Sequence, residues 1–225
     1  MLKAEFLIVL GCFSLLTLLA GVAFSRQNYF SRFKSKYSFK NMFPFEFNFR
    51  GSFADNMLGN VFMIVSFISL MLLYSLFEGA RTETYGIITF IGGCLASLMV
   101  CALFFVSTRF LKVHILLVAF AYAIIFLTIA TTALLNLKYY QFYQHPLPLV
   151  GFIYSIVLGV VTFALAMNPK LSFRINAKQE DGKEDKFVRP NWIPIAFTEW
   201  MMMLILYLNQ IGIIIFAISV SLKFL

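Results

Sequence analysis

The sequence predicts an all-α membrane protein, a polytopic bundle of six transmembrane helices in a single domain spanning residues 1–225. Of the 225 residues, 61% are hydrophobic and only 12% are charged, whereas a soluble domain carries about 25% charged residues. The apolar residues are grouped in blocks about as long as a bilayer span, ~20 residues each. Three connections between these blocks are short, which favours antiparallel neighbours in a compact bundle.

Six apolar segments are each long enough to cross a membrane. A helix rises ~1.5 Å per residue, so ~20 residues cross the ~30 Å hydrocarbon core. The first segment follows Lys3, as the core of a signal peptide would. Its apolar stretch is long for that role and a basic segment follows it, which favours a retained helix. The predicted spans are residues 5–24, 57–77, 85–106, 113–136, 149–167 and 195–222.

Two of these spans carry small or polar residues that favour close helix packing. In lipid, such residues let helix backbones approach one another. They are Gly59, Asn60, Ser66 and Ser69 in the second span, and Gly92, Gly93, Ala96 and Ser97 in the third. We therefore expect these two helices to pack closely within the bundle.

The loop after the first span contains the stretch "FPFEFNFRGSF". Its aromatic residues Phe43, Phe45, Phe47 and Phe49 alternate with polar residues or proline, and a period of two is typical of an extended segment. We predict a short extended segment that lays one aromatic face on the bundle or on the membrane interface. The alternative is an edge that binds lipid or a partner.

The basic residues are distributed unequally between the two membrane faces. Lys3, Arg81, Lys138 and Lys223 lie with the chain ends and the even-numbered loops, whereas the other fourteen of the 18 Lys and Arg lie in the first, third and fifth loops. We call the second group's side the basic face. The positive-inside rule predicts that the basic face is cytoplasmic and that both termini lie outside.

The net charge of +8 suggests anionic lipid headgroups rather than nucleic acid as the partner. No groove-reading motif accompanies the charge, and the basic residues lie between apolar spans. A partner membrane protein or a second copy of the chain stays open as an alternative.

Motifs of catalysis and cofactor binding are lacking in this sequence. It contains no G-x-S-x-G, P-loop, H-E-x-x-H or paired C-x-x-C pattern. His114 and His145 fall on opposite membrane faces, so they cannot ligate one haem or metal. Cys12, Cys94 and Cys101 lie within apolar spans and are typical of packing residues. We therefore predict no cofactor, no metal and no catalytic residue.

Polar residues do gather where three predicted spans begin on the basic face. Six alternating spans bring these starts to one membrane level, where their side chains can converge on a polar pocket, and ionisable groups at this depth are functional candidates. The more conservative interpretation is that Glu199 is a first-turn charge at the interface and Trp200 an aromatic anchor. The candidate binding residues are Asp55, Asn56, Arg109, Lys112, His114, Glu199 and Trp200.

Asn209 and Gln210 interrupt the last span about halfway through the membrane. Gln210 follows Glu199 by eleven residues, so both project from nearly the same side of the helix. Amide side chains in lipid commonly hold helices together. The alternative is a polar track from headgroup depth to mid-bilayer, and for this reason Gln210 belongs to the candidate binding residues.

Three stretches resemble a known family. They are "DNMLGNVFMIVSFISLML", "VHILLVAFAYAIIFLTIATT", in which a histidine opens the fourth span, and "PIAFTEWMMMLILYLNQIGIIIF", in which a Glu-Trp pair opens the sixth. The arrangement resembles the six-span damage-regulated autophagy modulators, whose superfamily includes proteins of GPI-lipid remodelling and phosphoinositide organisation. The first loop lacks the family's Ser-Asp-x-Gly type of sequence, and the charge balance predicts the reverse orientation. The resemblance implies a non-enzymatic, lipid-associated factor and singles out His114, Glu199 and Trp200.

Three functions follow from these observations. The first is binding of lipid or a partner membrane protein through the polar pocket on the basic face. The second is a transporter or channel for a small solute or ion along the helix face that carries Glu199 and Gln210. The third is a lipid-modifying enzyme with His114 and Glu199 as acid and base, although no nucleophile is identifiable.

Overall fold

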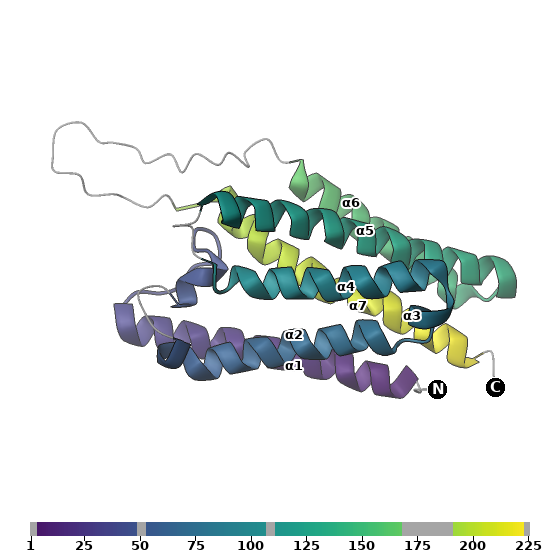
Figure 1. The fold of residues 1–225 in the computed structure, drawn as a ribbon, viewed down its shortest axis with the longest axis horizontal. Coiled ribbons are helices and arrows are strands. Elements are labelled where there is room, and N and C mark those ends of the chain that lie inside the picture. The colour runs from purple at the N-terminus through teal and green to yellow at the C-terminus, as the bar shows by residue number, and fades with distance from the viewer. Residues whose placement is uncertain (1–3, 49–52, 107–110, 168–190, 223–225) are drawn as a thin grey trace.

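The fold is known from a computed structural model, which describes residues 4–48, 53–106, 111–167 and 191–222. Within these ranges the regular elements are all helical, and six helices are long and apolar enough to cross a membrane (Figure 1). The predicted fold class is therefore confirmed. The helices are α1 (Ala4–Phe33), η1 (Pro44–Asn48), η2 (Phe53–Asn56), α2 (Met57–Leu76), α3 (Gly79–Thr82), α4 (Thr84–Leu103), α5 (Leu111–Tyr143), α6 (Pro146–Ala166) and α7 (Pro194–Leu222).

Two helices extend well beyond the predicted spans. α1 continues past residue 24 to Phe33 and α5 continues past residue 136 to Tyr143. Each helix is followed directly by a residue with a left-handed backbone, Lys34 with φ 53° after α1 and Gln144 with φ 54° after α5. The N–H of each donates back to a helix carbonyl, at 2.9 Å to Phe30 and 2.8 Å to Tyr140. Backbone caps of this kind, rather than the loss of hydrophobicity, set where these helices stop.

The Phe-rich loop is not the extended segment that its alternation predicts. Residues Pro44–Asn48 form the 3-10 helix η1. The Glu46 carboxylate accepts a 2.9 Å hydrogen bond from the Phe43 N–H, and the Glu46 N–H donates to the Phe43 carbonyl at 3.0 Å. These bonds close a tight turn, which buries Phe43, Phe45 and Phe47 together. Phe49 lies outside the described residues.

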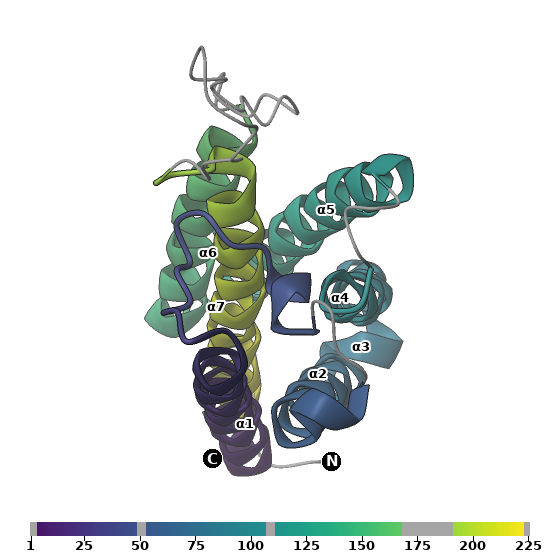
Figure 2. The same cartoon turned by 90° about the vertical axis from the view of Figure 1, so that its left-hand side faces the viewer.

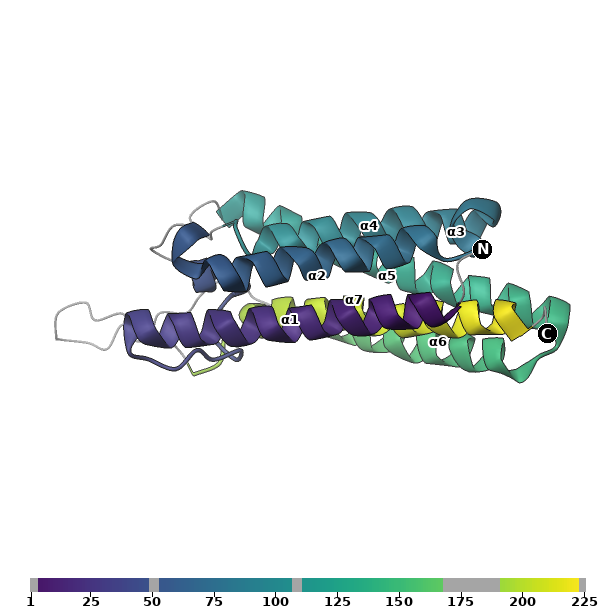
Figure 3. The same cartoon turned by 90° about the horizontal axis from the view of Figure 1, so that it is seen from below.

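α7 runs through the middle of the bundle. It contacts α1, α2, α4, α5 and α6, and a larger share of it is buried than of any other spanning helix in the described ranges. Figure 2 looks along the helices and shows α7 between α6 and the α2–α4 pair, and Figure 3 shows it alongside α1. Most of α7 therefore meets protein, whereas one side that includes Leu204 and Ile211 is exposed.

The small residues of the second and third spans lie inside the bundle, as expected. Gly59, Asn60, Gly92, Gly93 and their neighbours on the same rows are buried. A Cβ atom on Gly93 would collide with the Tyr74 ring of α2. The absence of a side chain at this position is thus what permits α2 and α4 to pack.

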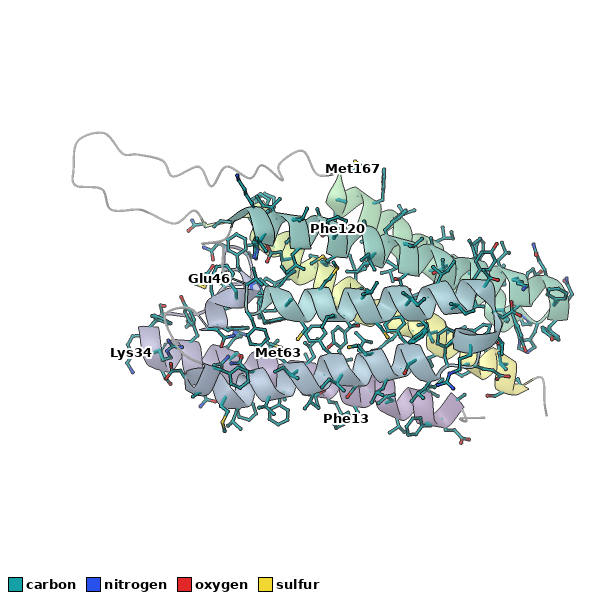
Figure 4. The ribbon with its side chains drawn as sticks, in the orientation of Figure 1. Phe13, Lys34, Glu46, Met63, Phe120 and Met167 are labelled. Atoms are coloured by element: carbon teal, nitrogen blue, oxygen red, sulfur yellow. The ribbon has the colours of Figure 1, made fainter. Side chains whose placement is uncertain are left out.

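The two ends of the bundle differ in what they carry. One end holds both described chain ends, α3 and the turn between α5 and α6 (Figure 1). The other end is the basic face, where α1 ends and where α5 and α7 begin. There the Lys34, Lys36, Lys40 and Lys112 side chains are exposed. Figure 4 shows Lys34 and Glu46 at this end.

Candidate functional site

A histidine and a glutamate from different helices meet at the basic face. His114 lies in the first turn of α5 and Glu199 in the second turn of α7. The His114 Nε2 and Glu199 Oε1 atoms are 2.8 Å apart, and each residue is only 1% exposed. The two residues that the alternation of spans grouped together are therefore in direct contact.

The second ring nitrogen of His114 defines how the pair shares protons. His114 Nδ1 is 2.9 Å from the Val106 carbonyl oxygen. A carbonyl only accepts hydrogen bonds, so Nδ1 carries a hydrogen. Nε2 then either accepts from a protonated Glu199 or donates to a carboxylate, and in both states the pair has no net charge. Because the pair has no net charge, burying its two ionisable groups costs less free energy than burying one unpaired charge.

The pair lies beneath residues 37–48, which we call the aromatic cap. The rings of Phe43 and Phe45 meet the His114 ring edge-on at centroid distances of 6.0 and 5.8 Å. The Ile193 N–H donates to the Lys40 carbonyl at 2.9 Å, which fastens the cap to the start of α7. The aromatic cap therefore separates the pair from the aqueous side of the basic face.

Trp200 of α7 holds the aromatic cap against the bundle. It is 6% exposed, and its Nε1–H donates to the Met42 carbonyl at 2.9 Å. Its ring contacts Phe39 and Phe47 of the cap and Phe104 at the end of α4. Trp200 is thus a buried link between α7 and the cap, and not the interface anchor of the conservative interpretation.

Glu46 is a second carboxyl group at the site, and the sequence reasoning missed it. It is 5% exposed, and its carboxyl group is close enough to that of Glu199 for the two to interact electrostatically. Burial, together with the nearby Glu46 carboxylate, raises the pKa of the Tyr37 phenol well above its ordinary value. The signal for Glu46 was present in the sequence as the one acidic residue inside the Phe-rich stretch.

One oxygen of Glu199 is left without a partner. Among the described residues no group forms a hydrogen bond to Glu199 Oε2, although the atom is buried. Most buried polar atoms in proteins are paired, so each exception asks for an explanation. Within the described part of the chain, Glu199 Oε2 is thus an acceptor without a hydrogen-bond donor.

Asn56 belongs to a different polar cluster on the same face. It is 3% exposed and donates to Ser25 of α1 at 3.0 Å and to Asn60 of α2 at 3.2 Å. The Asn28 side chain donates to Asn56 Oδ1 at 3.3 Å. These bonds join α1 to α2 and explain Asn56 as a packing residue.

Two other predicted residues, Asp55 and Lys112, do not meet the pair in the described structure. The side chains of Asp55 and Lys112 are exposed, so neither lies in the buried site with His114. Arg109 lies outside the described residues.

Gln210 and Asn209 act as contacts between helices. Gln210 Oε1 accepts a 3.0 Å hydrogen bond from Ser14 of α1, and the Asn209 side chain donates to the Tyr74 hydroxyl of α2 at 3.0 Å. Gln210 lies about 16 Å along the helix from Glu199, and it contributes to the bundle interior rather than to the His114–Glu199 site.

The chemistry available at the site is that of proton sharing and hydrogen-bond acceptance. In the described part of the chain, no three His, Cys, Asp or Glu side chains are grouped as a metal site would require. The site therefore offers two carboxyl groups, one imidazole and an aromatic lining, at the end of the bundle that carries the exposed lysines.

Comparison with protein-family models, with curated proteins and with solved structures gives no match. The fold and the site alone define the class: a helical membrane protein with six candidate spans and a buried His–Glu pair at one end.

Proposed function

We propose that the protein is a non-enzymatic integral membrane protein that binds an anionic, hydroxyl-bearing lipid headgroup at the basic face. The observation that carries this proposal is the buried His114–Glu199 pair beneath the aromatic cap, in which Glu199 Oε2 has no partner within the described residues, at an end of the bundle that carries exposed lysines. The resemblance to six-span lipid-associated factors agrees with such a role.

The two parts of the site suit the two parts of such a headgroup. The exposed Lys34, Lys36 and Lys40 ammonium groups attract a lipid phosphate, each contributing ~1 kcal/mol near a membrane surface. A headgroup hydroxyl is a hydrogen-bond donor, and Glu199 Oε2 is an acceptor that receives no hydrogen bond from the described residues. Because Glu199 is 1% exposed, the aromatic cap has to move for the hydroxyl to reach it.

A thermal-shift experiment separates these two parts. The purified protein is placed in phosphatidylcholine nanodiscs, and phosphatidylglycerol or phosphatidic acid is added. Both carry a phosphate, but only phosphatidylglycerol adds hydroxyl groups. We expect phosphatidylglycerol to raise the melting temperature more than phosphatidic acid does, and both to exceed added phosphatidylcholine.

Variants assign each effect to its residues. Glu199→Met removes both carboxyl oxygens and should abolish the preference for phosphatidylglycerol over phosphatidic acid while the protein still accumulates. Lys36→Gln combined with Lys40→Gln should weaken the response to both anionic lipids. Arg81→Gln removes an exposed charge at the opposite end and serves as the control. A Glu199→Met protein that fails to accumulate would make Glu199 a structural residue and overturn the proposal.

A transport path along α7 is the second candidate. Two further buried acceptors without partners in the described chain, Asn136 Oδ1 and Asn209 Oδ1, lie deeper along the same helix bundle. Flux of protons or small solutes into proteoliposomes tests this path. Loss of flux in Asn209→Leu, against retained flux in Ser221→Ala near the end of α7, would favour transport over lipid binding.

A further inference from the structure

A cavity of about 300 Å³ lies at the end of the bundle opposite the basic face. Its walls come from α3, from the last turns of α5 and from the last turns of α7. The residues that define its chemistry are Glu78, Glu83, Lys138, Tyr139, Tyr143 and Phe216. The volume is at the lower end of the ~300–1,000 Å³ range of small-ligand sites.

Aromatic rings form one side of this cavity. The Tyr139 and Tyr143 centroids are 4.3 Å apart, and the Phe216 ring of α7 meets Tyr139 edge-on at 5.3 Å. Rings from two helices thus line one space. The faces of aromatic rings attract cations, most of all quaternary ammonium groups, whose methyl groups also gain from an apolar contact.

The charged residues of the cavity favour a single positive charge. Lys138 pairs with Glu83, whereas no ion pair to Glu78 is found in the described part of the chain. The two carboxylates and one ammonium group leave one net negative charge. This balance disfavours an anion and matches a monovalent cation.

One polar atom in the cavity wall has no partner. The Tyr139 hydroxyl is buried and makes no hydrogen bond within the described ranges. A phenol can donate to a phosphate oxygen, so a ligand that joins an ammonium group to a phosphate would satisfy both features of the wall.

We propose that this cavity binds a quaternary ammonium cation, the group carried by the headgroup of phosphatidylcholine and by free choline. The rings of Tyr139, Tyr143 and Phe216 hold the methylated nitrogen, and Glu78 neutralises its charge. The Tyr139 hydroxyl contacts only a ligand that carries a phosphate. The site is separate from the one on the basic face and does not depend on it.

Equilibrium binding tests this site with two probes. Radiolabelled choline and a short-chain phosphatidylcholine are each titrated against the full chain, purified in a maltoside detergent that lacks ammonium groups. Glu78→Gln should raise the dissociation constant of both probes by about threefold or more. Glu5→Gln removes an exposed carboxylate at the same end of the bundle and should change neither.

A second variant distinguishes the two sources of the cation. Tyr139→Phe keeps the ring but removes the hydroxyl. If the lipid is the ligand, this variant should weaken the binding of phosphatidylcholine and leave the binding of choline unchanged. Choline binding without phosphatidylcholine binding would support the cation site with a soluble ligand. Failure of both probes to bind, or unchanged binding in Glu78→Gln, would overturn the proposal.

Discussion

His114 and Glu199 are 85 residues apart in the sequence, yet their Nε2 and Oε1 atoms lie 2.8 Å apart inside the bundle. The contact joins the starts of α5 and α7 and supports the underside of the aromatic cap. Because His114 Nδ1 donates to the Val106 carbonyl, the pair holds one shared proton and stays neutral.

Removal of the Glu199 carboxyl group should destabilise the protein. Glu199→Ala leaves the buried Nε2 of His114 without a partner, at a cost of about 1–3 kcal/mol. Glu199→Gln keeps a hydrogen bond, because its amide N–H donates to the unprotonated Nε2, so its cost should be smaller. Thermal unfolding in detergent should rank the melting temperatures wild type, Glu199→Gln, Glu199→Ala.

The double variant His114→Ala, Glu199→Ala completes the cycle. If the two residues act as a pair, its loss of stability should be less than the sum of the two single losses. Strict additivity would mean that the contact contributes nothing to stability.

Trp200→Phe should loosen the aromatic cap without unfolding the bundle. The variant keeps an aromatic ring but loses the hydrogen bond to the Met42 carbonyl, worth about 0.5–1.5 kcal/mol. Hydrogen exchange of residues 37–48 should accelerate by about 2- to 10-fold.

Tyr154→Phe is the matched control for the cap. It loses a hydrogen bond of similar length, 2.8 Å to the Leu208 carbonyl, within the α6–α7 contact. Exchange in the cap should stay at the wild-type rate in this variant. Equal acceleration by both variants would contradict the role assigned to Trp200.

Two glycines in spanning helices should respond oppositely to alanine. Gly93→Ala drives a methyl group into the Tyr74 ring, and overpacking of this kind costs about 1–3 kcal/mol. A Cβ on Gly159 would have its nearest neighbour, Ile129 Cγ2, at an ordinary 3.6 Å. Gly159→Ala should therefore be neutral or stabilising by up to ~1 kcal/mol. Equal melting temperatures for the two variants would contradict the α2–α4 packing.

The basic face should lie in the cytoplasm. In a cysteine-free background, a membrane-impermeant maleimide should label Arg81→Cys on intact cells and Lys40→Cys only after permeabilisation, because both side chains are exposed and lie at opposite ends. Labelling in the reverse order would show that the distribution of Lys and Arg does not set the orientation of this protein.

The sequence predicted the helices better than it predicted the loop between α1 and α2. Apolar blocks alone located all six candidate spans, because lipid requires such blocks. The alternation of spans placed the starts of both helices at one level but left open whether His114 and Glu199 meet, and the structure brings the two into contact. The ends of α1 and α5 were predicted too early, because left-handed caps at Lys34 and Gln144 are decided by local backbone bonds.

The aromatic cap could not be predicted from its alternation. Its 3-10 turn depends on the hydrogen bond between the Glu46 carboxylate and the Phe43 N–H. Phe43 and Phe45 also pack with residues at the start of α7, a contact that exists only in the folded bundle. For the same reason, the sequence did not indicate that Glu46 belongs to the site or that Trp200 is buried. Asn56 and Gln210 were singled out for their polarity, which helix contacts explain.

Binding of a headgroup hydroxyl by Glu199 at the basic face can be measured by native mass spectrometry. The protein is released from detergent with equal amounts of phosphatidylglycerol and phosphatidic acid, and the bound lipids are counted. Wild-type protein should retain phosphatidylglycerol in excess. Glu199→Met, which lacks both carboxyl oxygens, should retain the two lipids equally while still binding more of both than the Lys36→Gln, Lys40→Gln variant does. Equal retention by wild-type protein, or an unchanged excess in Glu199→Met, would show that Glu199 does not bind the hydroxyl.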